Sequence, residues 1–318
     1  MAFLKLIRIQ NLLIIAFTQY MVRWCLIYPL LKLSGGEFQL TNFHFFLLVL
    51  STVMIAAAGY VINDYFDVNI DKINKPERLV IGKSVKRRVA IGAHTVINFL
   101  AIVIAFYVSI VVGSWKLAVI HVFLTAGLWF YSTHFKRQFL IGNVIIALFV
   151  GLVPLVVGVY DLLPIYKFYY GIIDFGNFRT IWIYVMAISF FAFITTLLRE
   201  IIKDIEDYEG DKEYGCKTMP IVIGKTTTKY VVIIISIITM LCLAYLQHKQ
   251  FVSKDWKAFV YFTVALQIPF CFMIYKISKA QTKRDYRIAG NTSKVIMLLG
   301  VSFLFLFAYT ILKYANAI

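Results

Sequence analysis

The chain has 318 residues, of which 61% are hydrophobic and only 15% are charged, and its mean hydropathy is +0.81. A soluble globular domain carries about 25% charged residues and less apolar content, so this composition excludes an ordinary soluble protein. The formal net charge is +16 at pH 7, which is typical of a protein that binds nucleic acid or lies at an anionic membrane surface. We therefore expect an all-α, polytopic membrane protein.

Nine apolar stretches are long enough to cross about 30 Å of hydrocarbon as helices. In chain order they cover residues 12–31, 44–62, 89–112, 116–131, 139–160, 181–199, 229–246, 256–275 and 294–313. The third and fourth are separated only by "VGSW" (112–115), which predicts an antiparallel pair of helices. Pro154 and Pro269 fall inside predicted helices and are expected to kink them.

The distribution of basic residues predicts how the chain is oriented. With nine spans, most of the 32 Lys and Arg lie on the same side as the N-terminus. By the positive-inside rule, the N-terminus and the loops at 63–88 and 199–229 are expected to be cytoplasmic, with the protein in the cell (inner) membrane. Basic loops against anionic lipids explain the net charge, so we expect membrane lipids and no nucleic acid as partners.

Two nonapeptides, "NDYFDVNID" at 63–71 and "KDIEDYEGD" at 203–211, carry Asp at their second, fifth and ninth positions. The first aspartate set is Asp64, Asp67 and Asp71, and the second aspartate set is Asp204, Asp207 and Asp211. Each set has the spacing i, i+3, i+7, which on a helix places three carboxylates on one face within about two turns. Each set also follows a predicted span, so both lie at helix ends on the cytoplasmic side.

Three like charges on one helix face repel each other, so such a set is favourable where a cation binds it. Mg²⁺ prefers oxygen ligands and commonly combines one or two carboxylates with substrate phosphates. Two facing sets could hold Mg²⁺ on both sides of one diphosphate and make it a leaving group. We therefore predict catalytic and metal-binding roles for all six aspartates, with Asn63 and Lys203 contacting the same phosphates. The alternative is a pair of solvated, acid-rich helix ends.

Smaller features leave more than one interpretation open. The sequence "VIGK" occurs at 80–83 and again at 222–225, which indicates a duplicated unit and makes Lys83 and Lys225 either phosphate contacts or surface lysines. Arg23 lies inside the first span, next to Trp24. Its charge is either functional, or its long side chain reaches the far membrane interface. The four Cys and five His have no spacing typical of a metal site, and no nucleotide-binding loop occurs.

The residues 63–78, "NDYFDVNIDKINKPER", and 203–225, "KDIEDYEGDKEYGCKTMPIVIGK", resemble the UbiA-type superfamily of intramembrane prenyltransferases. The stretch "YSTHFKRQFLIGN" (131–143) is similar to that family's connection between the fourth and fifth helices. The resemblance covers most of the chain and implies one domain, 1–318, with nine transmembrane helices around a central lipid-accessible cavity. It also implies Mg²⁺-dependent transfer of an isoprenoid from its diphosphate to an acceptor.

The resemblance also assigns roles by matching position. It gives the metal and diphosphate to both aspartate sets, together with Asn63 and Lys203. It further implies substrate binding by Asn11, Arg78, Lys136 and Asn143, and we predict the same role for Arg199. Two positions depart from the family pattern, because Arg199 stands where many members have Tyr and Leu79 stands where Pro is common.

The run "REIIKDIEDYEGD" is most similar to the branch that makes digeranylgeranylglyceryl phosphate. That branch implies transfer from geranylgeranyl diphosphate to the free hydroxyl of geranylgeranylglyceryl phosphate, forming an ether lipid. Arg199 would suit an acceptor that carries its own phosphate. Quinone-precursor aromatics, such as 4-hydroxybenzoate or a dihydroxynaphthoate, and porphyrin-type acceptors remain alternatives.

Other protein classes fit parts of the same pattern. A secondary transporter can have internal repeats, but its carboxylates lie near the membrane midplane rather than at helix ends. A CDP-alcohol phosphotransferase is also Asp-rich, but its first acidic motif needs DG and AR, which "NDYFDVNID" lacks. A Mg²⁺ channel or sensor would use the acidic residues without any chemistry. Release of diphosphate in the presence of Mg²⁺ distinguishes the enzyme from the transporter and the channel.

Overall fold

The computed structural model describes residues 2–169 and 175–315, except for the side chains of Arg78, residues 175–177 and residues 314–315. Within this part of the chain the secondary structure is helical, and an isolated bridge pairs Ile81 with Val85. Nine of the described helical segments are long and apolar enough to cross a membrane. The predicted all-α class and the predicted number of spans are therefore confirmed.

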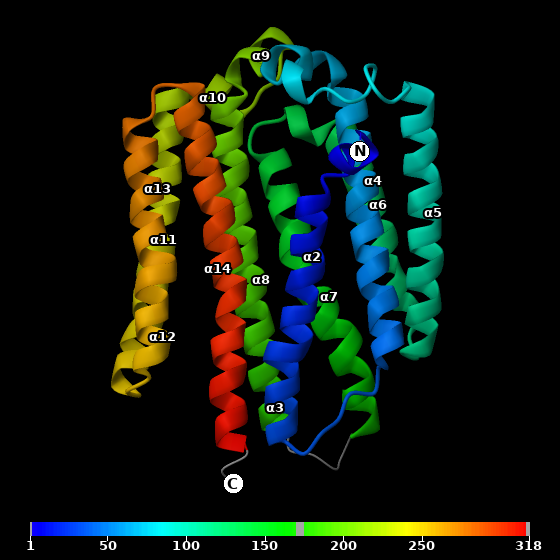
Figure 1. Ribbon diagram of the computed structural model, residues 1–318, viewed down its shortest axis with the longest axis vertical. Coiled ribbons are helices and arrows are strands. Elements are labelled where there is room, and N and C mark those ends of the chain that lie inside the picture. The colour runs from blue at the N-terminus through cyan, green and yellow to red at the C-terminus, as the bar shows by residue number, and fades with distance from the viewer. Residues whose placement is uncertain (1, 170–174, 316–318) are drawn as a thin grey trace. The chain divides into compact units, whose positions relative to one another are not determined.

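The helices are named as in Figure 1. Their bounds are α1 Ala2–Leu6, α2 Ile9–Met21, η1 Val22–Ile27, α3 Tyr28–Leu33, α4 Asn42–Asn74, η2 Pro76–Arg78, α5 Arg87–Val111, η3 Trp115–Leu117, α6 Ala118–Thr133, η4 Phe135–Arg137, α7 Ile141–Phe168, α8 Phe175–Glu206, α9 Tyr208–Glu213, α10 Met219–Val222, α11 Lys225–Val252, α12 Trp256–Tyr261, η5 Phe262–Gln267, α13 Ile268–Lys279 and α14 Lys283–Ala315. The first span combines α2, η1 and α3, and the eighth combines α12, η5 and α13.

The helices group into two compact units. Unit 1 comprises residues 1–136 and 153–185, and unit 2 comprises residues 137–152 and 186–318. Helices α7 and α8 each contribute one part to either unit. The first aspartate set belongs to unit 1 and the second to unit 2. The single domain over 1–318 stays a prediction.

Unit 1 is organised around α4, which packs against α2, α5 and α6. Figure 1 shows α5 alongside α4, and the short connection after α5 leads through η3 into α6, which also contacts α5. This is the helix pair that "VGSW" predicts. Gly59 on α4 makes the contact with α6 close, because a Cβ there would lie 2.8 Å from Leu128 Cδ1. Small residues of this kind let membrane helices approach each other.

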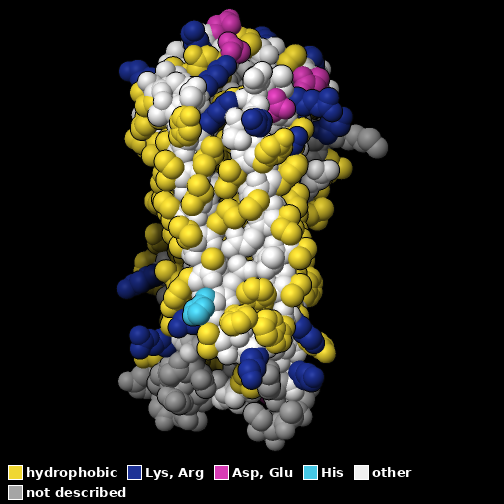
Figure 2. Space-filling model, turned by 90° about the vertical axis from the view of Figure 1, so that its left-hand side faces the viewer, with side chains coloured by type: hydrophobic (Ala, Val, Ile, Leu, Met, Phe, Trp, Pro, Cys, Tyr) yellow, Lys and Arg dark blue, Asp and Glu magenta, His cyan; other side chains and the backbone are white. Residues whose placement is uncertain are grey.

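Unit 2 has a continuous apolar core formed by α8, α11, α13 and α14. Its fully buried members include Ile201 and Ile202 on α8, Phe270 on α13 and Ile296 on α14. The outward faces are also apolar, and Figure 2 shows hydrophobic side chains along the middle of the molecular face drawn there, with Lys and Arg toward its ends. Exposed apolar side chains suit a lipid environment, and the chain is an integral, multi-pass membrane protein.

Two helices extend beyond their predicted spans and into the aspartate sets. The second predicted span ends at residue 62, but α4 continues to Asn74, and the Lys75 N–H still bonds to the Asp71 carbonyl at 2.8 Å. The sixth predicted span ends at residue 199, but α8 continues to Glu206. Hydropathy drops where polar side chains begin, whereas the backbone hydrogen bonds of a helix continue beyond that point. The first aspartate set is therefore helical, as its spacing predicts.

Proline positions coincide with a change in the helical turn. Pro154 lies inside α7, and Pro269 lies at the start of α13, directly after the π-helical segment η5. The same combination occurs in the first span, where Pro29 follows the π-helical segment η1. A wider turn accommodates the proline ring, which would otherwise clash with the carbonyl four residues earlier. The predicted kink at Pro269 thus has a local counterpart in η5, whereas Pro154 lies within the uninterrupted α7 and its kink stays a prediction.

Arg23 does not extend toward an interface, contrary to one of its two interpretations. Its side chain is fully buried in unit 1 and forms an ion pair with Asp161, which is also fully buried. The Arg23 Nη2 donates a second hydrogen bond to the Leu40 carbonyl at 2.6 Å. The guanidinium also lies 4.1 Å from the ring centroid of Phe38 and 4.4 Å from that of Phe45. Arg23 therefore connects three segments of unit 1.

Candidate active site

The first aspartate set lies on the last turns of α4 in unit 1. Asp67 is buried, with 4% of its surface exposed, whereas Asp64 and Asp71 are partly buried. Asn63, one residue before the set, is also buried. Because α4 is continuous over this region, the three carboxylates follow the helical spacing and share one side of the helix.

Lys136, a predicted substrate-binding residue, contacts this set. Its Nζ forms an ion pair with Asp67 and lies 3.3 Å from Asn63 Oδ1. Lys136 belongs to η4, the short helix that follows α6. The structure thus brings Lys136 to two other predicted site residues, Asn63 and Asp67, from which it is about 70 positions away in the chain. A carboxylate, an amide and an ammonium group in one place can bind a phosphate and its counter-ion.

Arg8, a basic residue just before the first span, also contacts the first set, and no sequence pattern predicts this contact. Its Nη2 donates to Asp64 Oδ1 at 2.7 Å, and its guanidinium lies 4.9 Å from the ring centroid of Tyr60. Burial alone would lower the pKa of Arg8, but the charge of Asp64 and the bond to it raise the pKa above its ordinary value. A basic residue before a span indicates topology, so nothing in the sequence pointed to a partner on α4.

The second aspartate set lies in unit 2 and is not on one continuous helix. Asp204 is on α8, Asp207 has φ −93° and ψ 7° between α8 and α9, and Asp211 is on α9. The prediction of one uninterrupted helical face is therefore wrong for this set. The Asp207 side chain makes no capping hydrogen bond to α9, so no capping motif in the sequence marks this break. Asn143, at the start of α7, donates to Asp204 Oδ2 at 2.8 Å, so it contacts this set as a predicted substrate-binding residue.

Two other predicted residues of unit 2 share one carboxylate that was not predicted. Arg199 Nη1 lies 2.5 Å from Glu200 Oε1, and Lys203 Nζ lies 3.4 Å from Glu200 Oε2. Glu200 is buried, with 6% of its surface exposed. Arg199 and Lys203 therefore lie on either side of one buried acid along α8.

The remaining candidates are two predicted substrate-binding residues and the two lysines of the repeated "VIGK". Asn11 lies on α2, where its N–H bonds to the Arg8 carbonyl at 2.8 Å. Arg78 ends η2, and its side chain is outside the described residues. In the repeated "VIGK", Lys83 Nζ donates to the Pro76 carbonyl at 2.9 Å and Lys225 Nζ pairs with Glu209 at 3.0 Å. A phosphate contact by either lysine stays a hypothesis.

The chemistry of both aspartate sets fits Mg²⁺, because carboxylate and amide oxygens are its preferred protein ligands. Among the described residues, however, no three His, Cys, Asp or Glu side chains lie close enough together to hold a metal ion. In unit 1, Arg8 and Lys136 instead bond to two carboxylates of the first set. The assignment of the six aspartates as metal ligands and catalytic residues therefore stays a prediction, as does the central cavity.

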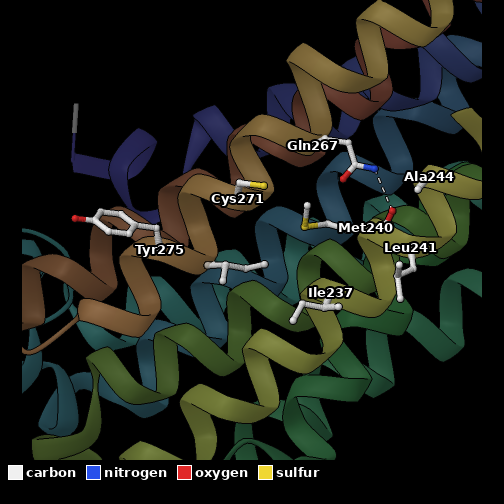
Figure 3. Close-up of a pocket in the computed structure, with 8 residues that line it drawn as sticks. Ile237, Met240, Leu241, Ala244, Gln267, Cys271 and Tyr275 are labelled. Atoms are coloured by element: carbon white, nitrogen blue, oxygen red, sulfur yellow. Dashed lines mark hydrogen bonds between the residues drawn. The ribbon is translucent and has the colours of Figure 1, made fainter.

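A groove of about 580 Å³ occurs elsewhere in unit 2. It lies between α11 and α13, and its walls are almost entirely apolar, as Figure 3 shows. Gln267 is an exception, and its Nε2 donates to the Met240 carbonyl at 3.0 Å. None of the predicted site residues lines this groove, so it is not a candidate for the diphosphate site.

Comparisons with known proteins address the family. A model described as the UbiA prenyltransferase family matches residues 24–294. The digeranylgeranylglyceryl phosphate synthase of Methanobrevibacter smithii is 35% identical over 204 residues, which cover 64% of this chain and 67% of that protein. The synthase of the same name from Methanosphaera stadtmanae is 27% identical over 263 residues, 82% of this chain and 87% of that protein. Other synthases of this name are matched over 58% of their own length.

Two solved structures share the fold. One concerns digeranylgeranylglyceryl phosphate synthase in membranes and has a TM-score of 0.59 at 23% identity, covering 96% of this chain and 97% of that chain. The other is a UbiA homolog from Archaeoglobus fulgidus bound to DMAPP and Mg²⁺, with a TM-score of 0.55 at 17% identity over 96% and 99% of the two chains. The family model covers well over half of this sequence. The chain therefore belongs to the UbiA prenyltransferase family and is a membrane-embedded prenyltransferase.

Proposed function

We propose that this prenyltransferase transfers a geranylgeranyl group from geranylgeranyl diphosphate to the free hydroxyl of geranylgeranylglyceryl phosphate. The observation that carries the proposal is the similarity to digeranylgeranylglyceryl phosphate synthases, which reaches 82% of the chain. Arg199 supports it as well, because a guanidinium binds a phosphate in a bidentate manner and this acceptor carries one. The product is a glycerol phosphate with two ether-linked chains.

The proposed reaction exchanges one carbon–oxygen bond for another. The bond between the allylic carbon and the diphosphate oxygen breaks, and the diphosphate leaves with the bonding electrons. The acceptor oxygen bonds to that carbon, and its hydroxyl proton passes to the released diphosphate. Lys136 and Asn63 lie together at the first aspartate set and would hold the diphosphate there through hydrogen bonds.

We propose Mg²⁺ as the cofactor, held by carboxylates of both aspartate sets. When bound, Mg²⁺ would neutralise the charge of the diphosphate and stabilise it as a leaving group. Two observations support this: the donor atoms suit the ion, and a UbiA homolog of the same fold was solved with Mg²⁺. Lys203 and Asn143 would orient the second set, since Asn143 bonds to Asp204 and Lys203 precedes it.

We further propose that the N-terminus and both aspartate sets lie at the cytoplasmic side. Most Lys and Arg of the chain fall in the segments at that side, as the positive-inside rule requires. A diphosphate head group at this side would be supplied from the cytosol, while the isoprenoid tail stays in the bilayer.

The proposal is tested by product identification. Purified protein is incubated with Mg²⁺, geranylgeranyl diphosphate and, in separate reactions, geranylgeranylglyceryl phosphate, 4-hydroxybenzoate and a dihydroxynaphthoate. Products are identified by mass spectrometry, and released diphosphate is measured in parallel. Asp67→Asn tests the first set. Asp255→Asn is the matched control, because Asp255 only caps α12 by accepting from the Ala258 N–H, which Asn also does.

We expect the doubly prenylated glycerol phosphate from the wild type and from Asp255→Asn, and its loss in Asp67→Asn. Formation of an aromatic product alone would refute the acceptor and keep prenyl transfer. Absence of released diphosphate with every acceptor, from well-folded protein, would refute the proposed activity.

A further inference from the structure

Arg8 lies where the N-terminal segment meets the first aspartate set. It separates α1 from α2 and has a left-handed backbone conformation with φ 53°, which is uncommon for a residue with a side chain. Its side chain is 33% exposed and bonds to Asp64, whose side chain is 19% exposed. This arrangement directs a cation from another segment onto a predicted metal ligand.

The position of Arg8 is maintained by the short helix before it. Leu6 of α1 is fully buried in a cluster with Val61 and Val68 of α4 and with Ile81. The N–H groups of Ile7 and Arg8 bond to carbonyls of α1, at 3.0 Å to Phe3 and 3.1 Å to Lys5. The N-terminal segment is therefore packed against the helix that carries the first aspartate set.

Lys136 has the same relation to the next carboxylate of the set. It reaches Asp67 from η4, the connection after α6, whereas Arg8 reaches Asp64 from the N-terminus. Two cations from outside α4 thus neutralise two of three neighbouring carboxylates. Without them, the like charges on one helix face would repel each other.

We propose that Arg8 is a displaceable counter-ion of the first aspartate set and becomes a ligand of the diphosphate when the substrate binds. This inference rests on the proposed function, because it requires a metal–diphosphate substrate at this set. In the free protein Arg8 occupies Asp64 Oδ1, which competes with a metal for that oxygen. When a metal takes the carboxylate, the released guanidinium is adjacent to the new negative charge of the diphosphate, to which it can donate two hydrogen bonds.

The proposal predicts changes of opposite sign in one variant. Arg8→Met removes the competitor for Asp64, so a metal ion alone binds about three- to tenfold more tightly. The same variant lacks a phosphate ligand, so diphosphate in the presence of Mg²⁺ binds about tenfold more weakly. A role for Arg8 in folding alone would weaken both equilibria, since neither ligand could then find an intact site.

The experiment uses the full-length protein in detergent and two probes. Binding of Mn²⁺ without substrate is followed by electron paramagnetic resonance, and binding of inorganic diphosphate at fixed Mg²⁺ is followed by calorimetry. Arg87→Met is the matched control, because the Arg87 guanidinium lies 4.6 Å over the Tyr65 ring of α4, as that of Arg8 lies over Tyr60. Among the described residues, Arg87 contacts the ring and the carbonyl of Tyr65 rather than an aspartate of the first set. Arg8→Lys keeps the charge, so it tests the inference if Arg8→Met unfolds.

We expect tighter Mn²⁺ binding and weaker diphosphate binding in Arg8→Met, smaller changes of the same signs in Arg8→Lys, and no change in Arg87→Met. Unchanged or weaker Mn²⁺ binding in the Arg8 variants would overturn the counter-ion role. Unchanged diphosphate binding would overturn the ligand role. Failure of the proposed function would be recognised separately: the binding changes would have the expected signs, but the protein would make no prenylated product.

Discussion

The buried ion pair of Arg23 and Asp161 is expected to stabilise unit 1, and its removal can be tested one side chain at a time. Arg23→Leu leaves the Asp161 carboxylate buried and also leaves the Leu40 carbonyl without its 2.6 Å bond. Asp161→Leu leaves a buried guanidinium that keeps Leu40 and the rings of Phe38 and Phe45. We therefore expect the larger loss of stability for Arg23→Leu.

The magnitude follows from the burial of both side chains, which have no exposed surface. Breaking such a pair by removing one partner costs about 3–5 kcal/mol, because the remaining buried charge has lost its counter-ion. Replacing both partners by apolar residues is often close to neutral, since no buried charge remains. The double variant Arg23→Leu/Asp161→Leu should therefore be more stable than either single variant. A coupling free energy of about 2 kcal/mol or more is expected from the cycle.

The assay is thermal unfolding of the detergent-solubilised protein, followed by intrinsic fluorescence. For a chain of this size, 3–5 kcal/mol corresponds to a Tm lowered by roughly 4–8 °C in the single variants. Arg179→Leu is the control, because Arg179 is an exposed arginine of the same unit. Equal Tm values for wild type and both single variants, or a double variant whose loss equals the sum of the two, would refute the reasoning.

Three further outcomes are expected. Arg199→Met should raise the KM for the phosphorylated acceptor about tenfold and leave the KM for the prenyl diphosphate unchanged. Steady-state kinetics with each substrate varied in turn measures both values, and an equal rise in the two would contradict the prediction. Gly59→Val should lower the Tm, because its Cβ would already lie 2.8 Å from Leu128, whereas Gly92→Val, where a Cβ meets nothing within 4 Å, should change it much less. Chelation by EDTA should stop diphosphate release and added Mg²⁺ should restore it, so continued release after chelation would contradict the proposed cofactor.

Much of the fold could be predicted because it depends on local composition. Runs of apolar residues near 20 positions long predict spans whatever their partners, and nine such helices are present in the described chain. The helical spacing of the first aspartate set is equally local and holds on α4. The break at Asp207 could not be predicted, because the spacing of three aspartates assumes a continuous helix and Asp207 makes no capping hydrogen bond that would mark the break.

The contacts of the candidate site were less predictable, because they depend on packing between distant segments. Arg8 and Asp64 are 56 positions apart, and Arg23 and Asp161 are 138 positions apart. A basic residue before a span, such as Arg8, and an acidic residue within a span, such as Asp161, each have a local interpretation. Neither interpretation predicts which distant residue forms the ion pair. The resemblance to a family singled out Lys136 and Asn143 as substrate-binding residues without indicating that they contact Asp67 and Asp204, and Glu200 lay outside the motif positions.

The two π-helical segments, η1 and η5, have a consequence for how related chains should be aligned. A π-turn contains one residue more than an α-turn, so each segment shifts the register of the helix after it by about 100°. In a relative that lacks this extra residue, the same helix faces are packed on both sides of the turn only if the sequence alignment places a one-residue gap there. Gaps placed within residues 22–27 and 262–267 are therefore structurally reasonable, although both lie inside membrane spans.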